Sequence, residues 1–285
     1  KDFFFAREAV EYLERRDRIQ PFALFLYLWA PHPPLRVPEP YFSLFDPARL
    51  DLPPNVGTDA AGRPALRDRG VPFQLGRDLT PDDWRRVWAA HLGLVRLADD
   101  ALGMVLDAAA RTGVLDNAVT LFTVDHGDHL GQRGMYQKFE VYDAAARVPL
   151  VIHAPGGPAS RIRTPVSHLD VLPTLLSLLD IEAPPDLDGR SLRGAALAGR
   201  EVPERPVFIQ YSGNYSIGDI RRAVVLGPYK YVYDTSSDRE LYDLQADPME
   251  MTNLAQDPAH ADKVNELHAL CADWARTHND WVRFH

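Results

Sequence analysis

Apolar residues recur along this chain at two different spacings, and the spacing changes from segment to segment. Residues 2–18 and residues 80–113 repeat apolar side chains at helical intervals. Continuous apolar runs of strand length occupy residues 22–29, 119–124 and 148–152. Because helical stretches alternate with almost wholly apolar runs, the pattern predicts an α/β domain whose strands are covered on both faces.

The longer predicted helix has clear signals at both ends. Thr80 is suited to cap it, Pro81 to occupy its first position, and Gly113 to end it. We expect its core-facing stripe to consist of Trp84, Val87, Trp88, His91, Val95, Ala98, Leu102, Val105 and Ala109. Asp99 and Asp100 lie inside this helix, and we interpret them as solvated or paired residues and not as a catalytic carboxylate pair.

The pattern changes near residue 200. A stretch rich in Gly, Arg and Pro covers residues 199–206, and an amphipathic helix with Cys271 on its apolar face lies near the end of the sequence. Between them, short alternating or aromatic runs occupy residues 207–211, 222–226, 230–233 and 240–244. These runs predict an antiparallel sheet. We therefore predict an α/β domain over residues 1–200 and a small C-terminal α+β subdomain over residues 201–285.

Composition and charge narrow the classes of protein that fit. The formal net charge of -9 argues against a nucleic-acid partner, because binding of phosphates needs a basic surface. No stretch approaches the ~20 apolar residues of a membrane-spanning helix. Cys271 is the single cysteine, which excludes an internal disulfide and a cysteine-based metal cluster. The sequence pattern carries no signal for oligomeric state or cellular compartment.

Candidate chemistry follows the apolar run that ends at Val124. Asp125, His126 and Gly127 come next, and ligands of open α/β sheets bind beyond the carboxyl ends of strands. A carboxylate beside an imidazole, with a glycine that lets the backbone turn tightly, can form half of a divalent-metal site. On its own, however, the tripeptide is better explained as an aspartate-capped turn with an ordinary loop histidine.

His32 follows the apolar run of residues 22–29 in the same way. It stands between Pro31 and Pro33, which stiffen its backbone. A histidine at the end of a strand can donate a proton or a hydrogen bond to an anion. The local sequence alone favours an ordinary histidine in a proline-rich turn.

The order of these motifs resembles the sulfatase family of the alkaline phosphatase superfamily. The family pattern is T-x-D-[HN]-G, then L-G-x-x-G, a Lys, and an R-V-P-L strand, which correspond here to residues 123–127, residues 130–134, Lys138 and residues 147–150. Residues 31–34 match the P-H-x-P of the family. The resemblance extends over nearly the whole chain. It implies an alkaline-phosphatase-like mixed sheet flanked by helices, with a small C-terminal antiparallel-sheet subdomain and a terminal helix.

The resemblance also implies roles for individual residues. Asp125 and His126 would bind a divalent metal, Lys138 would contact the nucleophile and the ester oxygens, and His32 would assist the leaving group. Calcium is the metal that the resemblance favours, with manganese as the alternative, although the donor types also admit zinc. The implied activity is hydrolysis of a sulfate monoester of a small molecule or a glycan, and the loop at residues 46–80 would help to select it.

One part of the family pattern does not occur in these residues. The family nucleophile is a Cys or Ser in a C/S-x-[PA]-x-R motif that is converted to formylglycine, and residues 271–275 lack its Pro and Arg. Two acidic metal ligands near the family's N-terminus also have no counterpart here. We therefore expect this chain to be the middle and C-terminal portion of a sulfatase, and to be inactive on sulfate esters by itself.

Two other functions remain as alternatives. The first is a phosphonate or phosphodiester hydrolase of the same superfamily, because D-H-G occurs in both kinds of enzyme. The second is a noncatalytic sulfatase-like protein that binds sulfated sugars or a partner. The joint presence of His32, Asp125, His126 and Lys138 argues against the second, since a noncatalytic relative has no reason to keep all of them.

Overall fold

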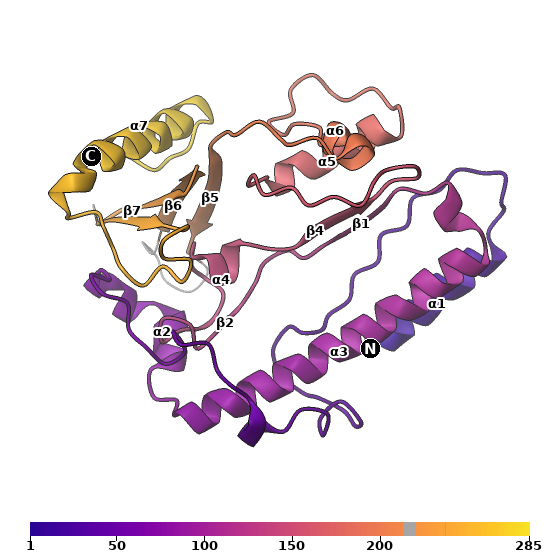
Figure 1. Ribbon diagram of the computed structural model, residues 1–285, viewed down its shortest axis with the longest axis horizontal. Coiled ribbons are helices and arrows are strands. Elements are labelled where there is room, and N and C mark those ends of the chain that lie inside the picture. Colours follow the sequence, from indigo (N-terminus) through magenta and orange to yellow (C-terminus); the bar gives the residue numbers. More distant parts are fainter. Residues whose placement is uncertain (214–219, 237) are drawn as a thin grey trace. The chain divides into compact units, whose positions relative to one another are not determined.

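The computed structural model describes residues 1–213, 220–236 and 238–285. Its helices are α1 (Asp2–Arg15), α2 (Val71–Gly76), α3 (Pro81–Arg111), α4 (Asp143–Ala146), α5 (Val171–Leu178), α6 (Arg193–Ala198) and α7 (Ala261–Thr277) (Figure 1). Its strands are β1 (Thr120–Thr123), β2 (His129–Leu130), β3 (Tyr136–Gln137), β4 (Leu150–His153), β5 (Val207–Ser212), β6 (Ile220–Leu226), β7 (Tyr229–Asp234) and β8 (Arg239–Asp243). Short 3-10 helices are η1 (Pro47–Arg49), η2 (Ala65–Arg69), η3 (Val114–Asp116), η4 (His168–Asp170) and η5 (Pro258–His260).

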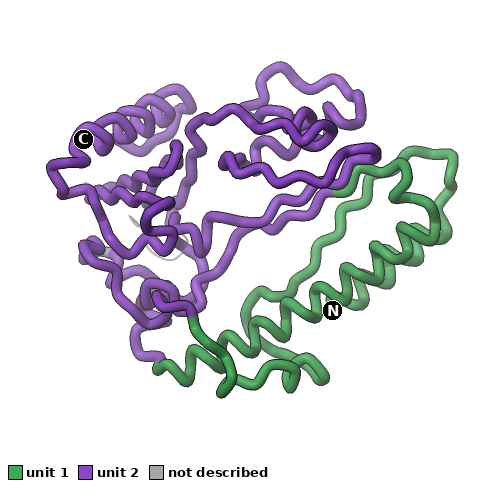
Figure 2. Tube along the Cα trace, in the orientation of Figure 1, with its two compact units in different colours: residues 1–52, 80–120 green, residues 53–79, 121–285 purple. Residues whose placement is uncertain are grey.

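The chain folds into two compact units, each of which is made of separate segments. Unit 1 consists of Lys1–Leu52 and Thr80–Thr120, and unit 2 of Pro53–Leu79 and Leu121–His285 (Figure 2). The domains predicted from the change of pattern at residue 200 stay a prediction.

Unit 1 is built on the packing of α1 against α3 (Figure 1). Small side chains form this interface, among them Ala6 of α1 and Ala101 and Ala108 of α3, and all of these are fully buried. The predicted core-facing stripe of α3 is partly wrong. Val95, which was placed in it, is 41% exposed, whereas its neighbour Leu94 is buried. Choosing the largest apolar side chains missed the alanines that let the two helices approach closely.

The ends and the polar face of α3 agree with the predictions. The Thr80 side chain accepts a hydrogen bond from the Asp83 backbone, and the Asp83 side chain accepts one from the Thr80 backbone, which completes a capping box. Asp100 accepts hydrogen bonds from Tyr41 (2.9 Å) and pairs with Arg96 (2.7 Å). These two partners hold the pKa of Asp100 below its usual value. Its interpretation as a paired surface residue is confirmed.

The strand predicted at residues 22–29 does not form. The segment has no regular secondary structure, and no strand of the described residues pairs with it. Leu26 and Leu28 pack against the α1–α3 core, whereas Phe25 is 71% and Tyr27 79% exposed. A strand needs hydrogen bonds from a neighbouring strand, and a run of residue types carries no information about that neighbour.

The predicted loop at residues 46–80 contains more structure than its composition indicated. It includes η1, η2 and the short helix α2. Its part in unit 2 is tied to residues 131–133 by backbone hydrogen bonds from Gly57 to Gly131 (2.8 Å) and from Arg133 to Asn55 (2.9 Å). These contacts come from residues that are distant in sequence, so local periodicity could not reveal them.

Unit 2 contains small sheets of different kinds. β1 pairs with β4, β2 with β3, and β5-β6-β7-β8 form a four-stranded sheet in chain order. All pairs in the last sheet are antiparallel, as predicted. Helix α7 packs on this sheet through Leu267 and Cys271, both fully buried, against Tyr231 and Leu241 (Figure 1). The mixed helix-and-sheet class, the C-terminal antiparallel sheet and the terminal helix are confirmed.

Helices of membrane-crossing length and hydropathy do not occur in the part of the chain that the structure describes.

Candidate functional site

Asp125 and His126 lie just after β1, where the sequence placed them. The backbone amide of His126 donates a hydrogen bond to Asp125 Oδ1 (3.1 Å), and His126 Nε2 lies 3.4 Å from Asp125 Oδ2. The Asp125 side chain is 87% exposed and that of His126 28%. His126 Nδ1 lies 2.9 Å from the Gly127 carbonyl oxygen, which can only accept, so Nδ1 carries the proton in this contact.

Gly127 has a different reason to be glycine from the one predicted. Its φ is not positive, so the tight turn that we expected is not what requires it. Instead, its amide donates to the Ala145 carbonyl (2.8 Å), and an added Cβ would lie 2.2 Å from the Ala144 carbonyl oxygen. Close approach of the turn to α4 therefore excludes a side chain here, and it holds Asp125 and His126 against a fixed helix.

The L-G-x-x-G motif forms the turn of the β2–β3 hairpin. Gly131 and Gly134 have φ values of 99° and 71°, which glycine adopts readily. Gly131 donates to Met135 (2.8 Å) and Gly134 to Gly131 (2.9 Å). The register pairs His129 with Gln137, so the turn brings the residue before Lys138 back against β2.

Lys138 is half-buried and directly follows β3. Both of its neighbours have left-handed backbones, with φ of 70° at Gln137 and 80° at Phe139. The Lys138 Nζ lies 5.8 Å from the centre of the Phe139 ring. Non-glycine residues rarely adopt a left-handed backbone conformation. One such residue on each side of Lys138 fixes the direction of the backbone at the lysine.

His32 belongs to unit 1, in the proline-rich turn after residues 22–29. Its amide donates to the Trp29 carbonyl (3.0 Å), and its ring packs on the Trp29 ring with centroids 4.9 Å apart. Its Nδ1 contacts the Pro33 carbonyl oxygen. These local contacts hold the half-buried imidazole in one orientation.

The structure thus brings Asp125 and His126 into direct contact and places Lys138 in the same unit. The donors of Asp125 and His126, one carboxylate and one imidazole, suit a divalent cation. No group of three His, Cys, Asp or Glu side chains suited to a metal occurs among the described residues. Asp125 and His126 can therefore supply only part of a ligand set, because a divalent cation such as Ca²⁺ takes about 6–8 ligands.

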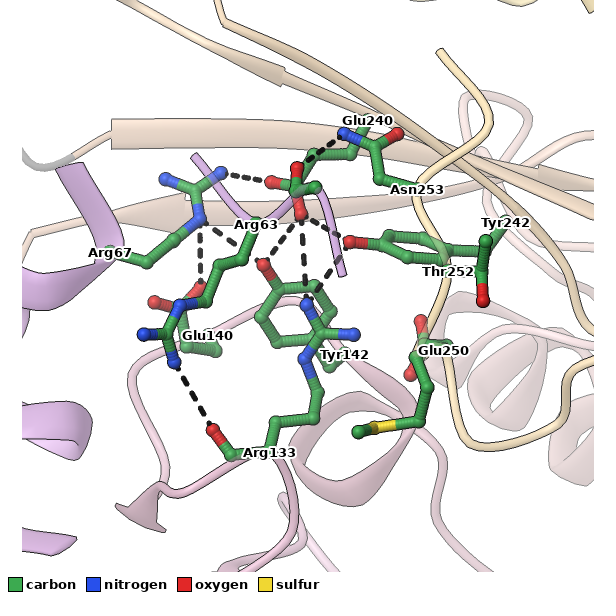
Figure 3. A network of polar contacts seen from close by, with 12 residues as sticks. Arg63, Arg67, Arg133, Glu140, Tyr142, Glu240, Tyr242, Glu250, Thr252 and Asn253 are labelled. Carbon is green, nitrogen blue, oxygen red and sulfur yellow. Dashed lines mark hydrogen bonds and ion pairs between the residues drawn. The ribbon is translucent and has the colours of Figure 1, made fainter. Parts of the chain in front are cut away.

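A buried ion cluster fixes the segment that bears Lys138 to the C-terminal sheet (Figure 3). We use this name for Arg67, Arg133, Glu140, Tyr142, Asp234, Glu240 and Tyr242. Glu240 accepts hydrogen bonds from Tyr142 (2.7 Å) and Tyr242 (2.6 Å), and Arg67 contacts Asp234 (2.7 Å). Burial alone would raise the pKa of Glu240, but Arg67 and Arg133 hold it below its usual value.

Sequence reasoning missed this cluster because its charged residues come from distant segments. Arg67 and Glu240, for example, are 173 positions apart. It also missed His129, which is fully buried beside the site. The only sequence feature that pointed to His129 was its position directly before the L-G-x-x-G turn. This position puts it on the strand that pairs with the strand preceding Lys138. Cys271, predicted to lie on the apolar face of the terminal helix, is fully buried in the core between α7 and the C-terminal sheet.

Comparison with known proteins identifies the family. The family model described as Sulfatase matches residues 1–181, and the model described as N-sulphoglucosamine sulphohydrolase, C-terminal, matches residues 131–276. The chain therefore belongs to the sulfatase family of the alkaline phosphatase superfamily, as its motifs predicted.

Individual relatives agree with this assignment. Choline-sulfatase of Rhizobium meliloti is 33% identical over 90% of this chain and 51% of the relative. The multifunctional alkaline phosphatase superfamily protein PehA of Trinickia caryophylli is 32% identical over 99% of this chain and 60% of the relative. The chain thus spans about half of the first relative's length and three fifths of the second's.

Solved structures confirm the fold. A structure of a protein in complex with its substrate, D-glucosamine-2-N,6-O-disulfate, matches 98% of this chain and 70% of its own with a TM-score of 0.84 and 21% identity. The phosphonate monoester hydrolase of Agrobacterium radiobacter matches 96% of this chain and 60% of its own with a TM-score of 0.80 and 27% identity. The alkaline-phosphatase-like fold is therefore confirmed.

Proposed function

We propose that this chain carries active-site residues of a sulfuric ester hydrolase that cleaves a sulfate monoester of a small molecule or a glycan. The observation that carries the proposal is the ordered set of Asp125-His126-Gly127, the L-G-x-x-G turn and Lys138 in a chain of the sulfatase family. The identity of 33% to a choline-sulfatase supports a sulfate ester as the substrate class.

Each proposed role follows from the charges that the reaction develops. The sulfate group is anionic, and Lys138 would neutralise its oxygens and those of the nucleophile. Breaking the S–O bond leaves an alkoxide or phenoxide, and His32 would donate the proton that this oxygen needs. Both residues have defined backbones, Lys138 between Gln137 and Phe139 and His32 between prolines, which favours a fixed orientation.

Asp125 and His126 are the proposed metal ligands. With the Nδ1 proton facing the Gly127 carbonyl, Nε2, which lies 3.4 Å from Asp125 Oδ2, is the nitrogen that would ligate. A bound divalent cation would polarise the sulfate oxygens. Calcium is the proposed ion and manganese the alternative. Formylglycine is the nucleophile of the family, and its motif does not occur in these residues, so no step is assigned to it.

A second candidate is a phosphonate or phosphodiester hydrolase. The observation that favours it is the likeness of the fold to the phosphonate monoester hydrolase of Agrobacterium radiobacter at 27% identity. Sulfate and phosphonate monoesters are both tetrahedral monoanions near neutral pH, so the same residues can accept either one.

The deciding experiment compares an aryl sulfate with the matched phosphonate monoester, using the protein as its source organism makes it. We expect faster turnover of the sulfate, loss of activity on removal of metal, and recovery with calcium. Preference for the phosphonate with recovery only in manganese or zinc would establish the second candidate. The expected inactivity of residues 1–285 by themselves can be checked in the same assay and stays a prediction.

Matched variants assign the roles. Asp125→Ala and Lys138→Ala should each lower kcat by about 10²–10³-fold, the usual loss for one stabilising group. Asp99→Ala and His153→Asn change exposed residues for which no role is proposed, and should leave kcat unchanged. Binding of a sulfated glycan without any turnover, unaffected by Asp125→Ala in calorimetry, would instead support a noncatalytic binding protein.

A further inference from the structure

The backbone on either side of Lys138 is held in an unfavourable conformation. Gln137 and Phe139 both have positive φ, which side chains with a Cβ adopt only when their surroundings impose it. The β2–β3 ladder is short, since it pairs only His129 with Gln137 and Leu130 with Tyr136. Contacts beyond this ladder must therefore hold the lysine segment in place.

A side chain supplies one such contact on each side of Lys138. His129 Nδ1 lies 2.8 Å from the carbonyl oxygen of Gln137, the residue directly opposite it in the hairpin. On the other side, Arg221 of β6 donates to the carbonyl oxygen of Phe139 (3.5 Å). Both His129 and Arg221 are fully buried.

The chemistry of the His129 contact is determined by its surroundings. Burial, with smaller contributions from Arg133 and Lys230, lowers the pKa of His129 to about 4, so the ring is neutral at neutral pH. The Gln137 carbonyl can only accept, hence the single ring proton is on Nδ1. The Nε2 atom is buried and has no hydrogen-bond partner among the described residues.

This arrangement is costly for a residue that only fills space. A buried nitrogen without a partner destabilises the fold, and an apolar side chain would avoid that cost. What the imidazole offers and an apolar side chain does not is the hydrogen bond to the Gln137 carbonyl. The ring also packs edge-on against Tyr142, with centroids 6.2 Å apart, which fixes its direction.

We propose that His129 is a positioning residue for Lys138, acting through its Nδ1–H···O=C bond to Gln137. The proposal rests on the proposed function in so far as Lys138 is the group that contacts the sulfate ester. His129 itself touches no substrate atom in this role. It fixes the left-handed backbone at Gln137 and thereby the point from which the lysine side chain extends.

A pair of substitutions separates hydrogen bonding from packing. His129→Asn keeps an N–H donor near the position of Nδ1 but loses the ring, whereas His129→Phe keeps a ring against Tyr142 but loses the donor. With an aryl sulfate, we expect H129F to lower kcat/KM by about 10–100-fold, the usual effect of a residue behind an active group. H129N should restore most of this activity. If H129F does not fold, His129→Leu takes its place.

A double substitution tests whether His129 acts through Lys138. In the Lys138→Ala background, H129F should cause no further loss of kcat/KM, because the group that it positions is gone. Additive losses, or better activity in H129F than in H129N, would overturn the proposal in favour of a packing role.

A readout without turnover keeps this test separate from the proposed function. The lysines of the chain are Lys1, Lys138, Lys230 and Lys263. After reductive ¹³C-methylation, the Lys138 signal, assigned by its absence in Lys138→Arg, should shift in H129F and return in H129N, while Lys263 stays constant. An unmoved Lys138 signal overturns the proposal even in an active enzyme. A shifted signal in a protein without sulfatase activity refutes only the proposed function.

Discussion

At the scale of single residues, contacts with backbone atoms decide where a side chain is tolerated. Gly127 and Gly103 are both glycines, yet a Cβ at residue 127 would lie 2.2 Å from the Ala144 carbonyl oxygen and a Cβ at residue 103 would meet nothing within 4 Å. Only the first is therefore required by the structure.

This difference predicts opposite effects of the same substitution. Gly127→Ala must push α4 away from the turn and should destabilise the protein by about 1–3 kcal/mol. Gly103→Ala, inside α3, should stabilise it by about 0.5–1 kcal/mol, because alanine loses less conformational freedom in a helix. Chemical denaturation of both variants measures the two changes. Equal effects would show that the contact with Ala144 is not rigid.

His129 makes stability depend on pH. Its pKa is about 4 in the folded protein and about 6.5 when unfolded, so between these values the unfolded chain binds more protons. The stability from neutral His129 is complete above pH ~6.5 and is lost as pH falls through ~4. From pH ~7.5 to ~5, wild type should lose about 2 kcal/mol more than His129→Asn in the free energy of unfolding. If the free energy of unfolding changed with pH by the same amount in wild type and in His129→Asn, the lowered pKa of His129 would be contradicted.

At the scale of elements, the buried ion cluster joins η2 to the C-terminal sheet. Arg67 is fully buried and contacts Asp234 and Glu240, both also fully buried. Removing one member of such a group leaves the others charged and unpaired in the interior, which costs far more than the loss of a surface pair.

We therefore predict a large difference between two arginine substitutions. Arg67→Met should destabilise the protein by about 3–5 kcal/mol, because Asp234 and Glu240 lose a buried partner. Arg147→Met removes an arginine that is 77% exposed and pairs with Asp143 at 3.5 Å, and should leave stability nearly unchanged. Thermal unfolding monitored by circular dichroism compares the two. A mild effect of Arg67→Met would mean that water reaches the cluster.

The elements also show how far a sequence predicts a fold. Helices α1 and α3 and the strands β5–β8 follow from periodicity and capping residues, which are local properties. The missing strand at residues 22–29 and the alanine-lined face of α3 depend on which segment lies alongside, and residue types do not encode that partner. The same reason separates Asp125, His126 and Lys138, found through an ordered motif, from His129, found only through its contact with Gln137.

At the scale of the whole molecule, charge limits the possible partners. The formal net charge is -9, so duplex DNA is repelled at long range. We predict no retardation of duplex DNA in a mobility-shift assay at ~0.1 M salt, with a basic protein as the positive control. Salt-sensitive retardation by this protein would reveal a basic surface that the net charge conceals.

The segment of residues 53–79 enters unit 2 between two segments of unit 1. It is joined to residues 131–133 through Gly57 and Asn55, and to the C-terminal sheet through Arg67. Relatives that diverge in specificity cannot therefore exchange this segment alone. A graft of this segment must include its contact partners in the β2–β3 hairpin and in the C-terminal sheet. We therefore expect these three parts to change together among relatives, and chimeras that separate them should misfold.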